Sequence, residues 1–161
     1  REELKRRLRR LPRLFLALAQ KLTAAGHLAG DKTLVWAPGF EIQFTPAQQR
    51  AVESFLARLA AAPYASPSVK ESEAELGAEV DAALLELERL VQVSPEVVFR
   101  EEDYAHLVAE TVRMLEEQGE IRVAELRDRF GTSRKYALAF LEHLDAAGLT
   151  VRAGDVRRMR P

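Results

Sequence analysis

A pattern of apolar residues and glycines recurs three times along the chain, and this internal repeat restricts the fold more than any other feature. Shifting the sequence by 54 positions aligns residues 76–90 with residues 130–144, and a shift of 122 aligns residues 4–26 with residues 126–148. The aligned pairs include Leu76 and Phe130, Gly77 and Gly131, Leu84 and Leu138, Leu4 and Leu126, and Gly26 and Gly148. A repeat at fixed spacing indicates one supersecondary unit used several times. We therefore expect three copies of one unit.

The last copy shows most clearly what this unit is. Residues 123–130 and 135–147 each carry apolar residues at helical spacing, which predicts two amphipathic helices. Gly131 favours a tight turn between them, because glycine adopts backbone conformations that other residues resist. Thr132 or Ser133 can cap the second helix through a side-chain oxygen. The pattern predicts a helix-turn-helix.

A hairpin is expected after each helix-turn-helix. The three candidates run from Leu28 to Phe40 around Gly30-Asp31, from Val91 to Phe99 around Ser94-Pro95, and from Leu149 to Met159 around Gly154-Asp155. Gly148 ends the helix before the last of them. Helix, turn, helix and hairpin together form a winged helix. The predicted fold is therefore mainly α with small β-hairpin wings, in tandem winged-helix modules.

We divide the chain into a first module (1–44), a middle module (45–100) and a last module (101–161). A further helix precedes the repeated unit in the middle module, where Thr45 and Pro46 form an N-terminal signal, and in the last module from Tyr104 to Leu115. The first module lacks this helix, because the sequence begins inside what should be its second helix. We expect this molecule to be a fragment of a longer protein.

Charge is segregated along the chain although the formal net charge is only −1. Residues 1–45 carry +5, residues 46–100 carry −4, residues 101–120 carry −6 and residues 121–161 carry +4. Basic ends around an acidic middle indicate that any polyanion is bound at the ends. The middle module is then an acidic spacer or a protein-facing element.

Two cations occupy an unusual place at the start of the last predicted helix. A helix N-terminus carries partial positive charge and favours Asp or Glu, yet Arg134 and Lys135 stand there. A bound phosphate would explain this, since N–H groups, dipole and side chains would all attract it. The alternative is a pair of solvated surface residues. The following hairpin adds four cations, Arg152, Arg157, Arg158 and Arg160.

The first module holds a second basic run. Lys5, Arg6, Arg7, Arg9, Arg10 and Arg13 crowd its start. This run is dense enough to contact RNA or the ribosome, and a solvated basic face is the alternative reading.

Catalytic and metal sites are not expected. Ser133 and His143 are ten residues apart on one predicted helix, about 15 Å, which is too far for a nucleophile and its base. Residues 26–33 resemble a phosphate-binding P-loop but have the wrong glycine spacing and follow a helix. The three histidines fall in separate modules, and the absence of cysteine excludes thiolate metal sites and disulfides. We expect no catalytic residue, cofactor or metal, and a cytoplasmic monomer without a membrane segment.

Residues 123–160 resemble a known family. The segment VAELRDRFGTSRKYALAFLEHLDAAGLTVRAGDVRRMR looks like the last winged-helix module of the bacterial selenocysteine-specific elongation factor, in which TSRKYA is recurrent. The APG and FTPAQQ stretches between Ala37 and Gln49 are also similar to the C-terminal half of that family. The resemblance extends over the whole chain, but only the last 40 residues are distinctive.

This resemblance implies a role in translation. In that family an N-terminal half binds GTP and selenocysteyl-tRNA, and the C-terminal winged helices bind a hairpin in the messenger RNA, the selenocysteine insertion element. The factor thereby delivers selenocysteyl-tRNA to the ribosome at an in-frame UGA codon. The GTPase lies outside these residues, so no enzymatic activity is expected. The implied RNA-binding residues are Ser133, Arg134, Lys135, Arg152, Gly154, Arg157 and Arg158, with Arg127 and Arg129 as further candidates.

Two other functions remain open from the residues alone. Winged helices most often read duplex DNA, so a transcriptional regulator is the first alternative; it would form a dimer on spaced half-sites. A protein scaffold of stacked winged helices, suggested by the acidic middle module, is the second. It would show no affinity for nucleic acid.

Overall fold

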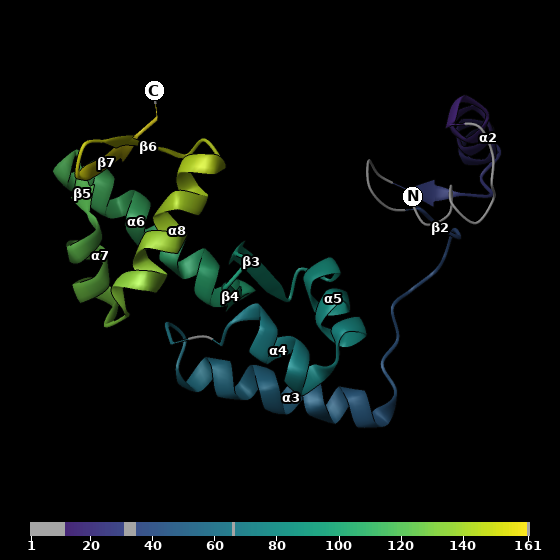
Figure 1. The fold of residues 1–161 in the computed structure, drawn as a ribbon, viewed down its shortest axis with the longest axis horizontal. Coiled ribbons are helices and arrows are strands. Elements are labelled where there is room, and N and C mark those ends of the chain that lie inside the picture. Colours follow the sequence, from purple (N-terminus) through teal and green to yellow (C-terminus); the bar gives the residue numbers. More distant parts are fainter. Residues whose placement is uncertain (1–11, 31–34, 66, 161) are drawn as a thin grey trace. The chain divides into compact units, whose positions relative to one another are not determined.

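The computed structural model describes residues 12–30, 35–65 and 67–160 of the chain. Its contacts divide the chain into two compact units, Arg1–Gln43 and Phe44–Pro161 (Figure 1). The predicted basic run at residues 5–10 lies outside the described residues, as does the centre of the first hairpin at 31–34. No helix in the described ranges is long and apolar enough to cross a membrane.

The first unit contains one described helix and one small hairpin. Helix α2 (Pro12–Ala24) is followed by strands β1 (Ala29–Gly30) and β2 (Val35–Trp36), which pair antiparallel. After α2, the backbone N–H of His27 donates to the carbonyl of Leu22 at 2.9 Å and closes the helix end. The helix and hairpin expected for the first copy are therefore present in the part that is described.

The second unit begins with three helices and a hairpin. These are α3 (Pro46–Ala61), α4 (Val69–Leu76), α5 (Ala78–Glu86), β3 (Leu90–Ser94) and β4 (Val97–Arg100). Thr45 and Gln48 form a capping box at the start of α3, as the Thr-Pro signal predicted, and Ser68 with Glu71 forms another at α4. Val52, Phe55, Leu56, Leu59, Val80, Leu84 and Leu90 form the core of this half.

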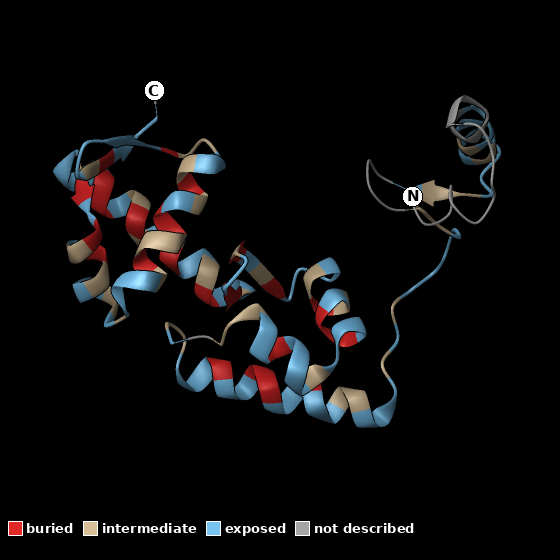
Figure 2. Ribbon diagram, viewed as in Figure 1, coloured by how far each residue is buried: buried red, intermediate tan, exposed pale blue. Residues whose placement is uncertain are grey.

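The rest of the second unit is a complete winged helix. It consists of α6 (Glu101–Gln118), β5 (Ile121–Arg122), α7 (Val123–Phe130), α8 (Arg134–Ala146), β6 (Thr150–Ala153) and β7 (Val156–Met159). The strands form a sheet in the order β5-β7-β6, with Arg157 of β7 opposite both Ile121 and Arg152. Strand β5 is a feature that the repeat pattern did not predict. Figure 2 shows the buried residues along the inward faces of α6, α7 and α8.

The hairpin β3–β4 belongs to two cores at once. Leu90 packs with α3 and α5 in the middle module, whereas Val93, Val97 and Phe99 belong to the core formed by α6, α7 and α8. Successive side chains of a strand point to opposite faces, so one hairpin can serve both neighbours. The middle and last modules are consequently packed together through the middle module's wing. The division into three modules itself stays a prediction.

Candidate nucleic-acid interface

The turn between α7 and α8 is built as the sequence predicted. Gly131 has φ 59°, in the left-handed region that glycine adopts readily. Ser133 caps α8: its backbone is extended, and its Oγ accepts a hydrogen bond from the N–H of Tyr136 at 3.3 Å. Arg134 and Lys135 follow in the first turn, which holds no acidic residue. The N–H groups of these two residues have no intrahelical acceptor and are available to an anion.

Arg134 lines a cleft between α8 and the wing. The cleft has a volume of about 410 Å³, and its other arginines are Arg122 from β5, Arg152 from β6 and Arg157 from β7. Two carboxylates, Glu142 and Asp155, also line it. The predicted convergence of the helix start and the wing is therefore present for Arg134 and Arg152. Within the described ranges, no hydrogen bond or ion pair occupies the guanidinium of Arg134.

Arg122 also lines the cleft, although the sequence pattern did not predict it there. Arg122 belongs to strand β5 and pairs with Val156 of the wing. This pairing brings Arg122 to the edge of the cleft. A cation just before the predicted helix at residue 123 was visible in the sequence. Without the third strand, nothing placed it beside the wing.

Lys135 is held by a carboxylate of the middle module. Its Nζ lies 2.7 Å from Oε2 of Glu96, which is in the β3–β4 turn, and both side chains are mostly exposed. The hydrogen bond to Glu96 raises the pKa of Lys135, and the charge of Glu71 adds to the effect. A phosphate at this position must compete with Glu96 for the ammonium group.

Arg157 lies in the wing, as expected, but its side chain is interior. Its side chain is 2% exposed, and its Nε lies 3.2 Å from Oδ2 of Asp145 near the end of α8. Thr150 donates to the other oxygen of Asp145 at 2.6 Å. Strand register explains the difference, because Arg157 sits in the central strand beside Ile121 and Arg152. The Asp145 contact gives Arg157 a packing role inside the wing. Its predicted role in binding RNA stays a prediction.

The other candidate cations already have partners. Arg158 pairs with Glu120 at 2.6 Å, Arg127 with Asp128 at 2.6 Å, and Arg129 with Glu110 at 2.7 Å. Hydrogen bonds from Arg113 and Arg129 lower the pKa of Glu110 to about 2. Arg152 donates to the carbonyl of Gly154 at 3.0 Å, and it makes no ion pair with any carboxylate among residues 12–30, 35–65 and 67–160. Arg134, Arg152 and Arg122 are thus the cleft arginines that have no carboxylate partner within the described part of the chain.

Helix α5, the middle module's counterpart of α8, begins with Ala78, Glu79, Val80 and Asp81 and has no cation in its first turn. Gly77 alone joins α4 to α5, and Val80 and Asp81, aligned with Arg134 and Lys135, are buried. Asp81 accepts a hydrogen bond from the hydroxyl of Ser72. This hydrogen bond gives Asp81 a role inside the module.

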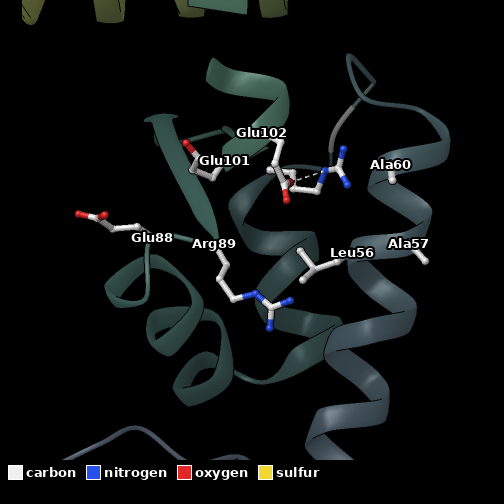
Figure 3. A pocket seen from close by; sticks show the side chains of 8 residues that line it. Leu56, Ala57, Ala60, Glu88, Arg89, Glu101 and Glu102 are labelled. Atoms are coloured by element: carbon white, nitrogen blue, oxygen red, sulfur yellow. Dashed lines mark ion pairs between the residues drawn. The ribbon is translucent and has the colours of Figure 1, made fainter. Parts of the chain in front are cut away.

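A separate pocket of about 280 Å³ lies where α3 of the middle module meets the start of α6 of the last module (Figure 3). Leu56, Ala57 and Ala60 of α3 form one wall. Arg89 and Arg100 bring positive charge, but Glu88, Glu101 and Glu102 also line the pocket, and Arg100 is paired with Glu102 at 3.1 Å. None of the residues expected to bind RNA belongs to it.

His143 and His106 both contact aromatic residues. His143 Nε2 lies 3.1 Å from the hydroxyl of Tyr104, and burial lowers the pKa of His143. His106 is stacked on Tyr64 with ring centroids 6.5 Å apart. Among the residues described, no group of three or more His, Asp or Glu side chains could hold a metal ion.

Comparison with known proteins identifies relatives of this fold. Residues 113–159 match the family model described as elongation factor SelB, winged helix, which confirms the resemblance seen in the last module. The chain is also similar to the mRNA-binding domain of elongation factor SelB from E. coli, solved in complex with SECIS RNA, with 23% identity and a TM-score of 0.51. That match covers 73% of this chain and 100% of the domain.

A second solved structure supports the same fold over more of the chain. The bacterial selenocysteine-specific elongation factor EF-Sec matches 89% of this chain with 17% identity and a TM-score of 0.59, and the match spans 23% of that protein. Both likenesses confirm tandem winged helices. A comparison with proteins of curated function gives no match.

Proposed function

We propose that this chain binds an mRNA hairpin, the selenocysteine insertion (SECIS) element, as the C-terminal part of a selenocysteine-specific elongation factor. The observation that carries the proposal is the cleft where Arg134 at the start of α8 meets Arg122 and Arg152. The family match of residues 113–159, and the SECIS RNA bound to the similar E. coli domain, support RNA as the ligand.

The cleft suits the backbone of an RNA loop. The major groove of A-form RNA is too narrow to admit a helix, so α8 would approach with its N-terminus instead of lying in the groove. There the free N–H groups of Arg134 and Lys135, the helix dipole and the Arg134 guanidinium all attract one phosphate. Arg152 would hold a second phosphate from the wing side. Contacts of this kind fix register, and unstacked loop bases supply sequence recognition.

Binding of this kind implies a tethering role in the whole factor. The last module would hold the factor on the message while other parts of the protein deliver selenocysteyl-tRNA to the ribosome. In this proposal the chain acts as a cytoplasmic monomer by binding alone, without a cofactor and without catalysing a reaction.

A gel-shift comparison tests the proposal. The complete chain is titrated into a labelled SECIS RNA hairpin, into a duplex DNA of the same stem sequence and into the single-stranded RNA. We expect tight binding to the hairpin only. Equal or tighter binding to the duplex DNA would support the transcriptional regulator instead, and no shift with any probe would favour a protein scaffold.

A further inference from the structure

The turn that presents the candidate RNA-binding residues is anchored outside its own module. The hydroxyl of Thr132 donates to the backbone carbonyl of Tyr64 at 2.5 Å. Tyr64 lies between α3 and α4, so this hydrogen bond joins residues that are 68 positions apart. Thr132 directly precedes Ser133, the residue that caps α8.

Tyr64 is itself fixed in place. Its ring makes an edge contact with Phe130 of α7 at a centroid distance of 5.0 Å and stacks on His106 of α6. The ring packs against the core of the last module, although the residue belongs to the middle module. The residue whose carbonyl accepts from Thr132 is therefore held by ring contacts with two helices of the last module.

The hydrogen bond from Thr132 to Tyr64 restrains the short turn between α7 and α8. Only Gly131, Thr132 and Ser133 separate α7 from α8, and Gly131 already has a left-handed backbone. Rotation at Thr132 would shift the capping oxygen of Ser133 and the first-turn N–H groups that follow it. Hydrogen bonds weaken steeply when distance and angle depart from their preferred values, so such a shift would weaken contacts with a phosphate.

We propose that Thr132 is a positioning residue for RNA recognition: its hydrogen bond to Tyr64 fixes the α7–α8 turn so that Ser133 and Arg134 face the RNA backbone. The proposal rests on the proposed function and adds a role for the middle module. That module supplies the fixed point against which the RNA-binding helix start is held, in place of the spacer role expected from its acidic sequence.

A pair of conservative variants of the complete chain tests this role. Thr132→Val keeps the shape and removes the hydroxyl, whereas Thr132→Ser keeps the hydroxyl and removes the methyl group. From the usual net worth of one hydrogen bond, we expect Thr132→Val to weaken binding of a SECIS RNA hairpin by about three- to tenfold. Thr132→Ser should remain within about twofold of the unaltered chain, because the same bond can form.

A double-mutant cycle separates positioning from simple stabilisation. If Thr132 acts by placing Arg134, then Thr132→Val should add little to the loss caused by Arg134→Ala, and the double variant should bind within about twofold of Arg134→Ala alone. A purely structural role would lower the unfolding midpoint without changing the affinity of the folded chain. All titrations are therefore run well below that midpoint.

Hydrogen exchange gives an independent readout of the turn. The amide of Tyr136, which donates to the Ser133 cap, should exchange faster in Thr132→Val than in Thr132→Ser. A SECIS hairpin that fails to bind the unaltered chain would reject the proposed function. A hairpin that binds the unaltered chain and Thr132→Val equally well would reject the positioning role alone, as would equal weakening by Val and Ser.

Discussion

Lys135 Nζ lies 2.7 Å from a carboxylate oxygen of Glu96, so a cation at the start of α8 is partly neutralised by the neighbouring module. The pair is exposed, and exposed ion pairs contribute little to stability because water screens them. Its larger effect is on the electrostatic potential that an approaching RNA meets. Glu96 reduces the attraction at the place where a phosphate is expected to dock.

Replacing Glu96 should therefore strengthen RNA binding. We expect Glu96→Gln to tighten the SECIS hairpin complex by a factor of about two to three, since Lys135 becomes available and a repulsive charge is lost. Fluorescence anisotropy at low salt measures the change. Glu86→Gln makes the same charge change on the exposed end of α5 and should have little effect. Weaker binding of Glu96→Gln would show that Glu96 helps to arrange the site.

Ser133 allows the cap and the phosphate contact to be tested separately. Ser133→Ala should lower the free energy of unfolding by about 1 kcal/mol, because the N–H of Tyr136 loses its acceptor. Ser133→Asp keeps an acceptor and should be close to the unaltered chain in thermal stability. Its added negative charge should nevertheless weaken RNA binding markedly. Normal RNA affinity of Ser133→Asp would place the phosphates elsewhere.

We expect loss of the buried Arg157 to reduce stability more than loss of the exposed Arg158 beside it. Arg157→Leu should cost about 2 to 4 kcal/mol in urea unfolding, because it leaves the partly buried Asp145 carboxylate without its cation. Arg158→Leu, one residue along, removes only an exposed pair with Glu120 and should cost less than about 1 kcal/mol. Similar costs for both variants would contradict the interior assignment of Arg157.

His143 should make stability depend on pH. Burial lowers its pKa from the ordinary value of 6.5, so the folded chain binds this proton less tightly than the unfolded chain does. Its contribution is fully present above 6.5 and is lost as the pH falls through 6.5 toward the lower folded value. Urea unfolding at several pH values should show this loss, and His143→Gln should reduce it. An unchanged pH profile would mean that His143 does not titrate in this range.

Local signals in the sequence predicted most of the secondary structure. The Thr45-Pro46 start of α3, the Ser133 cap and the turn at Gly154-Asp155 all depend on residues close together in the chain, and the structure contains each of them. The apolar faces of α3 and α8 were likewise visible as helical spacing. Such features follow from local chemistry, which a single sequence displays.

Features that depend on distant contacts were not predictable in the same way. In the sequence, Arg157 looks like any other cation of the wing. Only the register of the sheet shows that it faces Asp145. Strand β5 has only two residues and exists because β7 pairs with it. The contacts of Lys135 with Glu96 and of Thr132 with Tyr64 join two modules that the repeat pattern treats as separate.

The salt dependence of hairpin binding, measured for the unaltered chain and for Arg134→Ala, tests the central claim most directly. If three to five phosphates are neutralised, the logarithm of the association constant should fall against the logarithm of salt concentration with a slope of about −2 to −4. Arg134→Ala should weaken binding by about 1 to 3 kcal/mol and make the slope shallower by about one. Arg50→Ala removes one positive charge from an exposed position on α3 and serves as the control. It should leave the affinity and the salt slope nearly unchanged. Less than twofold loss for Arg134→Ala, with an unchanged slope, would contradict an RNA site at the start of α8.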